Sequence, residues 1–490
     1  MNGADILFTH SYFLRFDPKE LRAMTPYPPL GTLYAASIAR GLGYRPSLFD
    51  SMLAEGEAEI TPVIRRLRPR IVAIYDDDFN YLTKMCLTRM REAAFALAGI
   101  ARGEGCTVIV HGSDAADRAE EYIARGADYV LCGEGEGPLG DLLVALRDGG
   151  DPFAVRGVVA RDGLTLRRTL PHASVRDLDA LPMPAWDLID ASRYRDAWVN
   201  RHGHFSLNMV TTRGCPFHCN WCAKPIYGQA YASRSPANVV DEMIHLRHTL
   251  HPDHLWFCDD IFGLKPGWLG EFAAEVNRRG AHTPFKCLAR VDLLLKDNAV
   301  DHLAAAGCTS VWVGAESGSQ KILDAMEKGT TVGQIHEASR LLRAKGIRTG
   351  FFLQFGYPGE TRADIDRTLA MVRDCLPDDI GISVSYPLPG TPFYESVRRS
   401  LGGKKNWRVS EDLDLMFPGE FHPDFYRALH ALTHKRLRVW QGVKEARALA
   451  AAPWTASGAK LRRVAGGAYH VLTLPYYRRK MHALEKPLQA

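Results

Sequence analysis

The sequence has no apolar run near the roughly 20 residues that a helix needs to cross a bilayer. Its first residues, Met-Asn-Gly-Ala-Asp, lack the basic flank and apolar core of a secretion signal. It has no low-complexity segment, and a net charge of +5 over 490 residues gives no reason to expect a nucleic-acid partner. These absences predict a globular protein of the cytoplasm with no transmembrane segment.

Cysteine is too sparse for a disulfide scaffold, because ten residues are spread over 490. Small secreted domains concentrate their cysteines, whereas a large chain without a leader keeps them as thiols or metal ligands. Three of the ten stand close together, at Cys215, Cys219 and Cys222. This cluster is the candidate metal site.

Length and pattern predict several domains, since 490 residues exceed what one hydrophobic core usually serves. Over residues 1–150, apolar strands alternate with amphipathic helices, which indicates a doubly wound parallel sheet with strands at 5–8, 47–50, 71–75, 107–110 and 128–131. A proline-punctuated linker follows over 151–200. Six further strand–helix units over 201–400 predict a partial parallel barrel, and 401–490 is predicted to be helical.

The C-terminal region has one apolar helix face and one basic stretch. We expect the apolar face to pack in the core rather than bind a partner helix; it is formed by Phe425, Leu429, Leu432, Val439 and Val443. The basic stretch is interpreted as a solvated face, with weak attraction to a membrane surface as the open alternative; it contains Arg462, Arg463, Arg478, Arg479 and Lys480.

Polar residues and glycines follow the strands of the first domain. In doubly wound sheets, ligands bind at the carboxyl ends of the strands, and glycine lets a ligand approach the backbone closely. The candidate ligand-binding residues of this domain are therefore Asp76, Gly112, Ser113, Gly133 and Glu134.

The strongest motif directly follows the first strand of the second domain. It runs Arg213-Gly-Cys-Pro-Phe-His-Cys-Asn-Trp-Cys222, with the cysteine spacing C-x3-C-x2-C. Three thiolates on a tight loop can bind three irons of a four-iron cluster and leave the fourth iron open. The alternative, a zinc site, needs a fourth ligand from His218 or a distant cysteine.

This loop resembles the signature of the radical S-adenosylmethionine (SAM) superfamily, and residues 1 to about 400 resemble its cobalamin-binding branch. The resemblance implies that Cys215, Cys219 and Cys222 hold a [4Fe–4S] cluster whose open iron chelates the amino and carboxylate groups of SAM. Trp221 matches the aromatic position that approaches the adenine. The implied fold is α/β: a Rossmann-like cobalamin-binding domain, a partial (β/α)6 radical SAM barrel and a helical C-terminal region.

Five further positions match this family less specifically. The resemblance implies that Asp259 and Asp260 meet the methionine amino group and that Arg290 faces the cofactor carboxylate. Glu316 matches the acidic residue that meets the ribose, and Gly356 belongs to a backbone contact with adenine. Arg290 and Glu316 have an alternative interpretation as members of buried ion pairs in the barrel.

The front domain resembles the cobalamin branch through Pro28-Pro-Leu-Gly-Thr-Leu33 and Gly133-Glu-Gly-Glu136. It departs from many cobalamin proteins because Asp-x-His-x-x-Gly, the pattern that supplies a histidine to cobalt, is absent. We therefore expect base-off cobalamin whose lower face is covered by the loop 76–81. The alternative is a degenerate domain that has lost its ligand.

The resemblance implies chemistry through a 5'-deoxyadenosyl radical and methylcobalamin. The leading hypothesis is a methyltransferase that acts on a non-nucleophilic carbon, or less often phosphorus, of a small-molecule or natural-product substrate. Its electron donor would be a flavodoxin or ferredoxin, and no nucleic acid is expected. One alternative is radical oxidation or cyclisation without methyl transfer, as in the anaerobic cyclase of chlorophyll synthesis, and another is a non-catalytic cobalamin and iron–sulfur sensor.

A methylthiotransferase is disfavoured by the remaining cysteines. Cys86, Cys106 and Cys132 lie on separate predicted elements and form no obvious ligand set for a second cluster.

Overall fold

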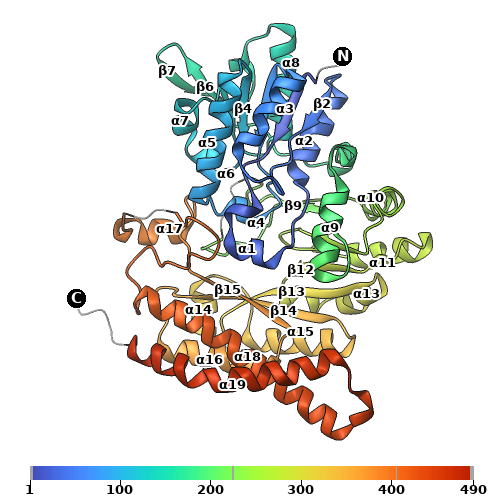
Figure 1. Cartoon of the computed structure of the whole chain (residues 1–490), viewed down its shortest axis with the longest axis vertical. Coiled ribbons are helices and arrows are strands. Elements are labelled where there is room, and N and C mark those ends of the chain that lie inside the picture. The colour runs from blue at the N-terminus through green and yellow to red at the C-terminus, as the bar shows by residue number, and fades with distance from the viewer. Residues whose placement is uncertain (1–3, 223–225, 404–405, 486–490) are drawn as a thin grey trace.

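The computed structural model describes residues 4–222, 226–403 and 406–485. Figure 1 shows an N-terminal α/β domain, a second α/β domain below it, and a pair of long helices at the far end. Both sheets and the helical C-terminal region confirm the predicted fold class. None of the described helices is long and apolar enough to cross a membrane.

The first domain contains a seven-stranded sheet in the order β2-β1-β3-β4-β5-β6-β7. Its five parallel strands are β2 (Pro46–Leu48), β1 (Ile6–Thr9), β3 (Ile71–Tyr75), β4 (Thr107–His111) and β5 (Tyr129–Leu131). One face packs against α2 (Leu30–Gly41) and α8 (Glu136–Asp148). The other face packs against α3 (Ile60–Leu67), α5 (Thr88–Gly103) and α7 (Ala119–Ala124). The sheet is therefore doubly wound.

This sheet continues beyond residue 150, where the sequence pattern predicts a linker. Strands β6 (Val158–Asp162) and β7 (Thr165–Arg168) form a hairpin that pairs antiparallel with β5, with Val130 opposite Val159. The hairpin supplies hydrogen-bond partners to the edge of β5, which would otherwise expose unpaired backbone groups. The predicted linker also contains helix α9 (Ala191–His202).

The second domain is an open barrel of six parallel strands. Their order is β8 (Ser206–Met209), β11 (His254–Phe257), β12 (Phe285–Ala289), β13 (Cys308–Glu316), β14 (Arg348–Phe355) and β15 (Asp379–Val384). The outer layer contains α10 (Pro236–Thr249), α11 (Trp268–Arg279), α13 (Ala299–Ala305), α15 (Val332–Ala344) and α16 (Arg362–Cys375). The six strands confirm the partial parallel barrel that the sequence predicts.

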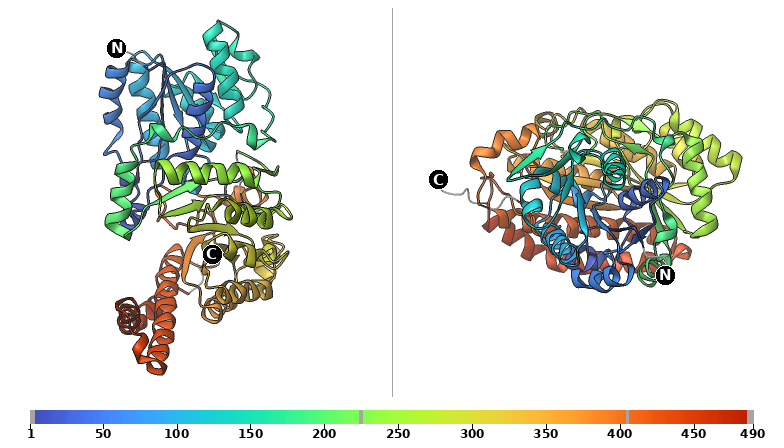
Figure 2. Two further views of the ribbon diagram at one scale, coloured as in Figure 1. Left: turned by 90° about the vertical axis from the view of Figure 1, so that its right-hand side faces the viewer. Right: turned by 90° about the horizontal axis from the view of Figure 1, so that it is seen from above.

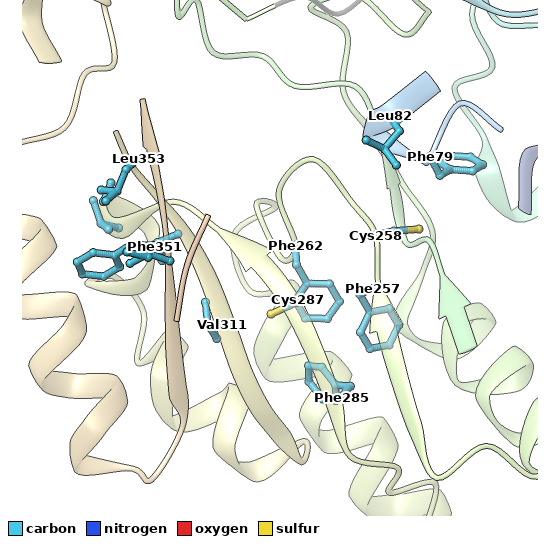
Figure 3. Packing of buried hydrophobic residues seen from close by; sticks show 14 of the residues in the cluster. Phe79, Leu82, Phe257, Cys258, Phe262, Phe285, Cys287, Val311, Phe351 and Leu353 are labelled. Carbon is cyan, nitrogen blue, oxygen red and sulfur yellow. The ribbon is translucent and has the colours of Figure 1, made fainter. Parts of the chain in front are cut away.

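Apolar side chains fill both sides of this curved sheet. Figure 3 shows Phe257, Phe262 and Phe285 packed together, and the rings of Phe257 and Phe285 lie 5.0 Å apart. On the inner side, Trp312 lies against Gly350, where an added Cβ would come within 2.3 Å of the indole. Glycine at this strand position therefore makes room for a large aromatic residue.

The C-terminal region is a helical hairpin of α18 (Pro423–Ala451) and α19 (Gly458–Ala483), preceded by the short helix α17 (Pro392–Val397). Of the predicted apolar face, Phe425, Leu429 and Leu432 are buried, whereas Val443 is 43% exposed. The left view of Figure 2 shows the hairpin beside the barrel, at the end of the molecule opposite the N-terminal domain.

Candidate functional site

The cysteine loop begins directly after β9 (Thr212–Arg213), which pairs with β10 (Ala232–Ser233). All three cysteines are partly exposed, and the Cys222 amide donates a hydrogen bond to the Cys219 carbonyl at 3.2 Å. Burial raises the pKa of Cys222 to about 12, and nearby Asp260, Cys219 and Cys215 add to the effect. Bound iron would favour the thiolate forms of such a group.

Glycine at position 214 allows the sharp turn into this loop. Gly214 has φ +75°, and an added Cβ would lie 2.0 Å from the Ala230 carbonyl oxygen. Any side chain at this position would clash with the backbone and displace the first cysteine.

Asn220 fixes the far half of the loop, a role that the sequence pattern does not reveal. Its amide N–H donates to the Met326 carbonyl at 3.1 Å, and its Nδ2 donates to the Ala325 carbonyl at 2.8 Å. The Tyr357 hydroxyl donates to Asn220 Oδ1 at 3.0 Å, and the Phe393 amide donates to the Asn220 carbonyl at 3.0 Å. Three distant segments therefore anchor the residue between the second and third cysteines.

Arg290 lies beside the cysteine loop. Its guanidinium carbon is 3.7 Å from the centre of the Phe217 ring, and Nη1 lies 3.9 Å from Cys219 Sγ. Asp292 accepts from Nε at 2.9 Å, and the Lys328 carbonyl accepts from Nη2 at 2.9 Å. Arg290 therefore brings a positive charge to the thiols and also belongs to an ion pair, as the alternative interpretation proposed.

Glu316 lies at a bulge in β13 with φ +53°. Its Oε1 accepts from Lys328 Nζ at 2.8 Å, and both side chains are buried. Lys328 Nζ is in turn 5.8 Å from the centre of the Trp221 ring. The Trp221 Nε1 is buried and has no hydrogen-bond partner among the described residues. The structure thus joins Glu316 and Trp221 through Lys328, which no sequence motif identified.

The two neighbouring aspartates after β11 have different environments. Buried Asp259 accepts four hydrogen bonds of 2.6–2.9 Å from the amides and hydroxyls of Thr211 and Thr212. Burial raises the pKa of Asp259 to about 6. Asp260 pairs with Lys84 of the first domain at 2.7 Å. Asp259 therefore holds the chain that leads into the cysteine loop, while Asp260 lies at the domain boundary.

Three predicted residues of the first domain come together at the ends of β3 and β4. Asp76 Oδ1 accepts from the Ser11 amide at 2.8 Å, and burial raises the pKa of Asp76 to about 6. A Cβ on Gly112 would lie 3.0 Å from Asp76 Oδ2. The Ser113 hydroxyl donates to the Thr83 carbonyl at 3.3 Å.

A buried ion-pair triad links the two domains. Arg213 Nη1 donates to Glu134, and Nη2 donates to Glu136 Oε1 at 2.6 Å. The guanidinium also lies 5.4–5.6 Å from the rings of Tyr34, Phe79 and Tyr227. Glu134 is thus paired with Arg213, the residue that directly precedes Gly214 of the cysteine loop.

Near this triad, four buried polar atoms have no hydrogen-bond partner among the described residues. They are Tyr75 Oη, His111 Nδ1, Glu136 Oε2 and Tyr227 Oη. His111 stacks on Tyr75 with ring centres 4.2 Å apart. Each unpaired buried polar group costs about 1–3 kcal/mol, so the cluster suits a ligand rich in amide or hydroxyl groups. Cobalamin carries such groups, and the residues present fit it chemically.

A cavity of about 210 Å³ lies between the domains and is lined by both. The first domain contributes Tyr12, Asp77 and Phe79, and the barrel contributes Asn208, Trp256, Lys286, Leu288, Trp312 and Phe352. Its wall combines aromatic and aliphatic side chains with several polar groups, which is the usual composition of a small-molecule site.

Glu360 is a buried acid that lies beside Gly356, the glycine predicted to contact adenine. Its Oε2 accepts from the Gly356 amide at 2.6 Å, and Oε1 has no partner among the described residues. Burial raises the pKa of Glu360 to about 8, so the folded protein keeps this proton at neutral pH.

Glu360 predicts a pH dependence of stability. Because its folded pKa is raised above the unfolded value, its contribution is lost as pH rises from about 4.5 to about 8, by at most roughly 1.4 kcal/mol per pH unit. Urea unfolding of the Glu360→Gln variant should lose less stability over this range than the wild type. Equal pH slopes for the two proteins would contradict the buried proton.

The chain is similar to several known proteins. The radical SAM superfamily model matches residues 209–372. An uncharacterized methyltransferase, PH0819 of Pyrococcus horikoshii, is 26% identical over 80% of this chain and 83% of its own. The anaerobic magnesium-protoporphyrin IX monomethyl ester cyclase of Cereibacter sphaeroides is 30% identical over 55% of this chain and 45% of its own.

Among solved structures, the fold is similar to that of the radical SAM methyltransferase TsrM from Kitasatospora setae with cobalamin and a [4Fe–4S] cluster bound. The TM-score is 0.65 at 19% identity, over 81% of this chain and 75% of that chain. The cysteine loop, the partial barrel and the family match agree on one assignment. Residues 209–372 therefore match the radical SAM superfamily, and the chain has a fold similar to that of cobalamin-bound TsrM.

Proposed function

We propose that the protein is a cobalamin-dependent radical SAM methyltransferase that acts on a non-nucleophilic carbon or phosphorus of a small molecule. One observation carries the proposal: Arg213, which directly precedes the cysteine loop, pairs with Glu134 and Glu136 beside the polar cluster of the first domain. A substrate in the aromatic cavity between the domains would be in reach of both sites.

In this proposal, Cys215, Cys219 and Cys222 hold a [4Fe–4S] cluster, which when bound supplies the electron that cleaves SAM. Arg290 places a positive charge beside the cluster ligands and suits the carboxylate of SAM. Trp221 offers a flat apolar face for adenine. Glu316 is held by Lys328, which leaves its second oxygen for a hydroxyl group.

Cobalamin would occupy the carboxyl ends of the first sheet, next to Asp76, Gly112, Ser113 and Gly133. The loop 76–81 carries three aspartates and no histidine, so the chain offers no imidazole from this loop to the metal. His111 Nε2 donates to the Gly133 carbonyl oxygen at 3.0 Å, so this nitrogen is already engaged within the first domain.

Relatives named as methyltransferases support methyl transfer over the cyclase alternative. PH0819 aligns with 80% of this chain and the hopanoid C-3 methylase of Methylococcus capsulatus with 85%, while the cyclases of Cereibacter sphaeroides and Rubrivivax gelatinosus align with 55% and 76%. The proposal also includes a small reducing protein such as flavodoxin or ferredoxin as electron donor, and no nucleic acid as substrate.

Isotope-labelled SAM distinguishes these functions. With SAM that carries a deuterated methyl group, the reduced, cobalamin-loaded enzyme should place the label on cobalamin and release an equal amount of S-adenosylhomocysteine. With substrate, each turnover should also release one 5'-deoxyadenosine and one labelled product. Product without label, accompanied only by 5'-deoxyadenosine, would show the cyclase-like function, and cofactor binding without SAM consumption would show the sensor.

A further inference from the structure

The outer face of α19 carries an apolar stripe that nothing in the described structure covers. Residues at helical spacing are exposed there: Leu461 by 55%, Tyr469 by 61%, Leu472 by 81% and Tyr476 by 64%. At the turn before this helix, Trp454 is 83% exposed. The hairpin of α18 and α19 holds half of the large apolar side chains that the described residues expose. Such a concentration marks an interaction surface.

The same hairpin concentrates positive charge. Residues 423–483 contain twelve Lys and Arg against two acidic residues, a net charge of +10, whereas the whole chain carries +5. Helix α19 itself contains six cations and no Asp or Glu. Among the described residues, only Arg463 of these six pairs with a carboxylate, that of Glu445 at 2.8 Å. The other five cations of α19 form no ion pair within the described part of the chain.

The inner face of α19 packs against the rest of the protein. Leu474 and Met481 are buried in the barrel core cluster, and Lys435 of α18 lies 4.7 Å from the centre of the Tyr477 ring. The two helices touch at Gly442 and Gly467, where an added Cβ would come within about 3 Å of the facing backbone. The packing therefore fixes the orientation of α19 and leaves the stripe facing outward.

The positive charge of the hairpin indicates which kind of partner this surface binds. A second copy of the chain would bring two surfaces of the same strong positive charge together, which is unfavourable. An apolar stripe with Trp and Tyr, flanked by Lys and Arg, is the composition of helices that lie in the plane of a membrane surface. Basic residues next to such a stripe attract anionic lipid headgroups.

We propose that the hairpin of α18 and α19 docks the protein on the surface of an anionic lipid bilayer. The stripe on α19 enters the headgroup region, and the flanking cations Arg462, Arg478, Arg479 and Lys480 meet the lipid phosphates. The hairpin lies at the end of the molecule opposite the N-terminal domain, so docking leaves that domain facing away from the bilayer (Figure 1). This inference does not depend on the proposed reaction.

Co-sedimentation of the full-length holoprotein with vesicles tests the docking surface. Vesicles that contain phosphatidylglycerol should bind the wild type at least about tenfold more tightly than vesicles of phosphatidylcholine alone, and raised salt should remove most of this preference. Replacing Arg478, Arg479 and Lys480 by Gln should weaken binding on the order of a hundredfold, at roughly fivefold per lost charge. Leu472→Asp should weaken it at least about tenfold.

Leu164→Asp is the matched control, because Leu164 is 98% exposed in the β6–β7 turn at the other end of the molecule. It should bind vesicles as the wild type does, and circular dichroism of every variant should report unchanged helix content. Absence of binding to anionic vesicles, equal binding to neutral ones, or an unaffected Leu472→Asp variant would each overturn the proposal. Binding of an acidic ferredoxin to this face in place of vesicles would overturn it in favour of a protein partner.

Discussion

Reductive cleavage of SAM should be abolished when Cys219 is replaced by alanine. Each of Cys215, Cys219 and Cys222 supplies one ligand to the proposed cluster, and two thiolates do not hold the three irons that leave the fourth open. Anaerobic reconstitution of the variant followed by iron and sulfide analysis should give little cluster. Incubation with dithionite and SAM should then give no 5'-deoxyadenosine above background.

The control for this experiment is Cys375→Ala. Cys375 is buried on α16, where its sulfur lies 3.4 Å from His336 Nδ1, and it takes no part in the cysteine loop. This variant should bind iron and cleave SAM like the wild type. Normal cleavage by the Cys219→Ala variant would show that the cluster is bound elsewhere.

The second large effect is expected at Arg213. Replacing it by methionine leaves the carboxylates of Glu134 and Glu136 buried without their cation, which typically costs about 3–5 kcal/mol of folding free energy. The loss should also loosen the turn at Gly214 and lower the iron content, because Arg213 ends the strand that leads into the loop. Urea unfolding and electron paramagnetic resonance of the reduced cluster measure the two effects.

Two further variants test whether the stability loss comes from unpaired buried charge or from the loss of the arginine side chain itself. Adding Glu134→Gln and Glu136→Gln to Arg213→Met removes the unpaired charges and should recover most of the lost stability. Arg45→Met breaks the largely exposed ion pair with Asp5 and should cost much less stability than Arg213→Met. An Arg213→Met protein as stable as Arg45→Met would show that the interdomain triad does not hold the domains together.

Both parallel sheets could be predicted from the sequence, because the apolar periodicity of strands and helices is a local property. Apolar runs separated by amphipathic helices predict parallel strands whatever lies beyond them, and the six units of the barrel were found in this way. The β6–β7 hairpin was missed, since its strands are short and half polar, and its place in the sheet depends on the free edge of β5. The sequence pattern therefore places the end of the first domain at residue 150, before the hairpin that completes its sheet.

The partners of the acidic residues could not be predicted from the sequence. Asp259 and Glu134 stand where the family resemblance places cofactor contacts, yet their carboxylates are taken up by Thr211 and Thr212 and by Arg213. Lys328 and Asn220 support the site without belonging to any motif. These contacts join residues 12 to about 137 positions apart, so sequence spacing carries no trace of them.

The sequence by itself determined the chemistry of the cysteine loop, because three thiols within eight residues must lie together in any fold that forms the turn. It also determined the alternation of strands and helices, which depends only on the period of apolar residues. Only the tertiary structure decided which charges pair across the domain boundary and which apolar residues of α19 stay exposed. Both depend on how distant elements pack, since burial and ion pairing are properties of the assembled surfaces and not of local sequence.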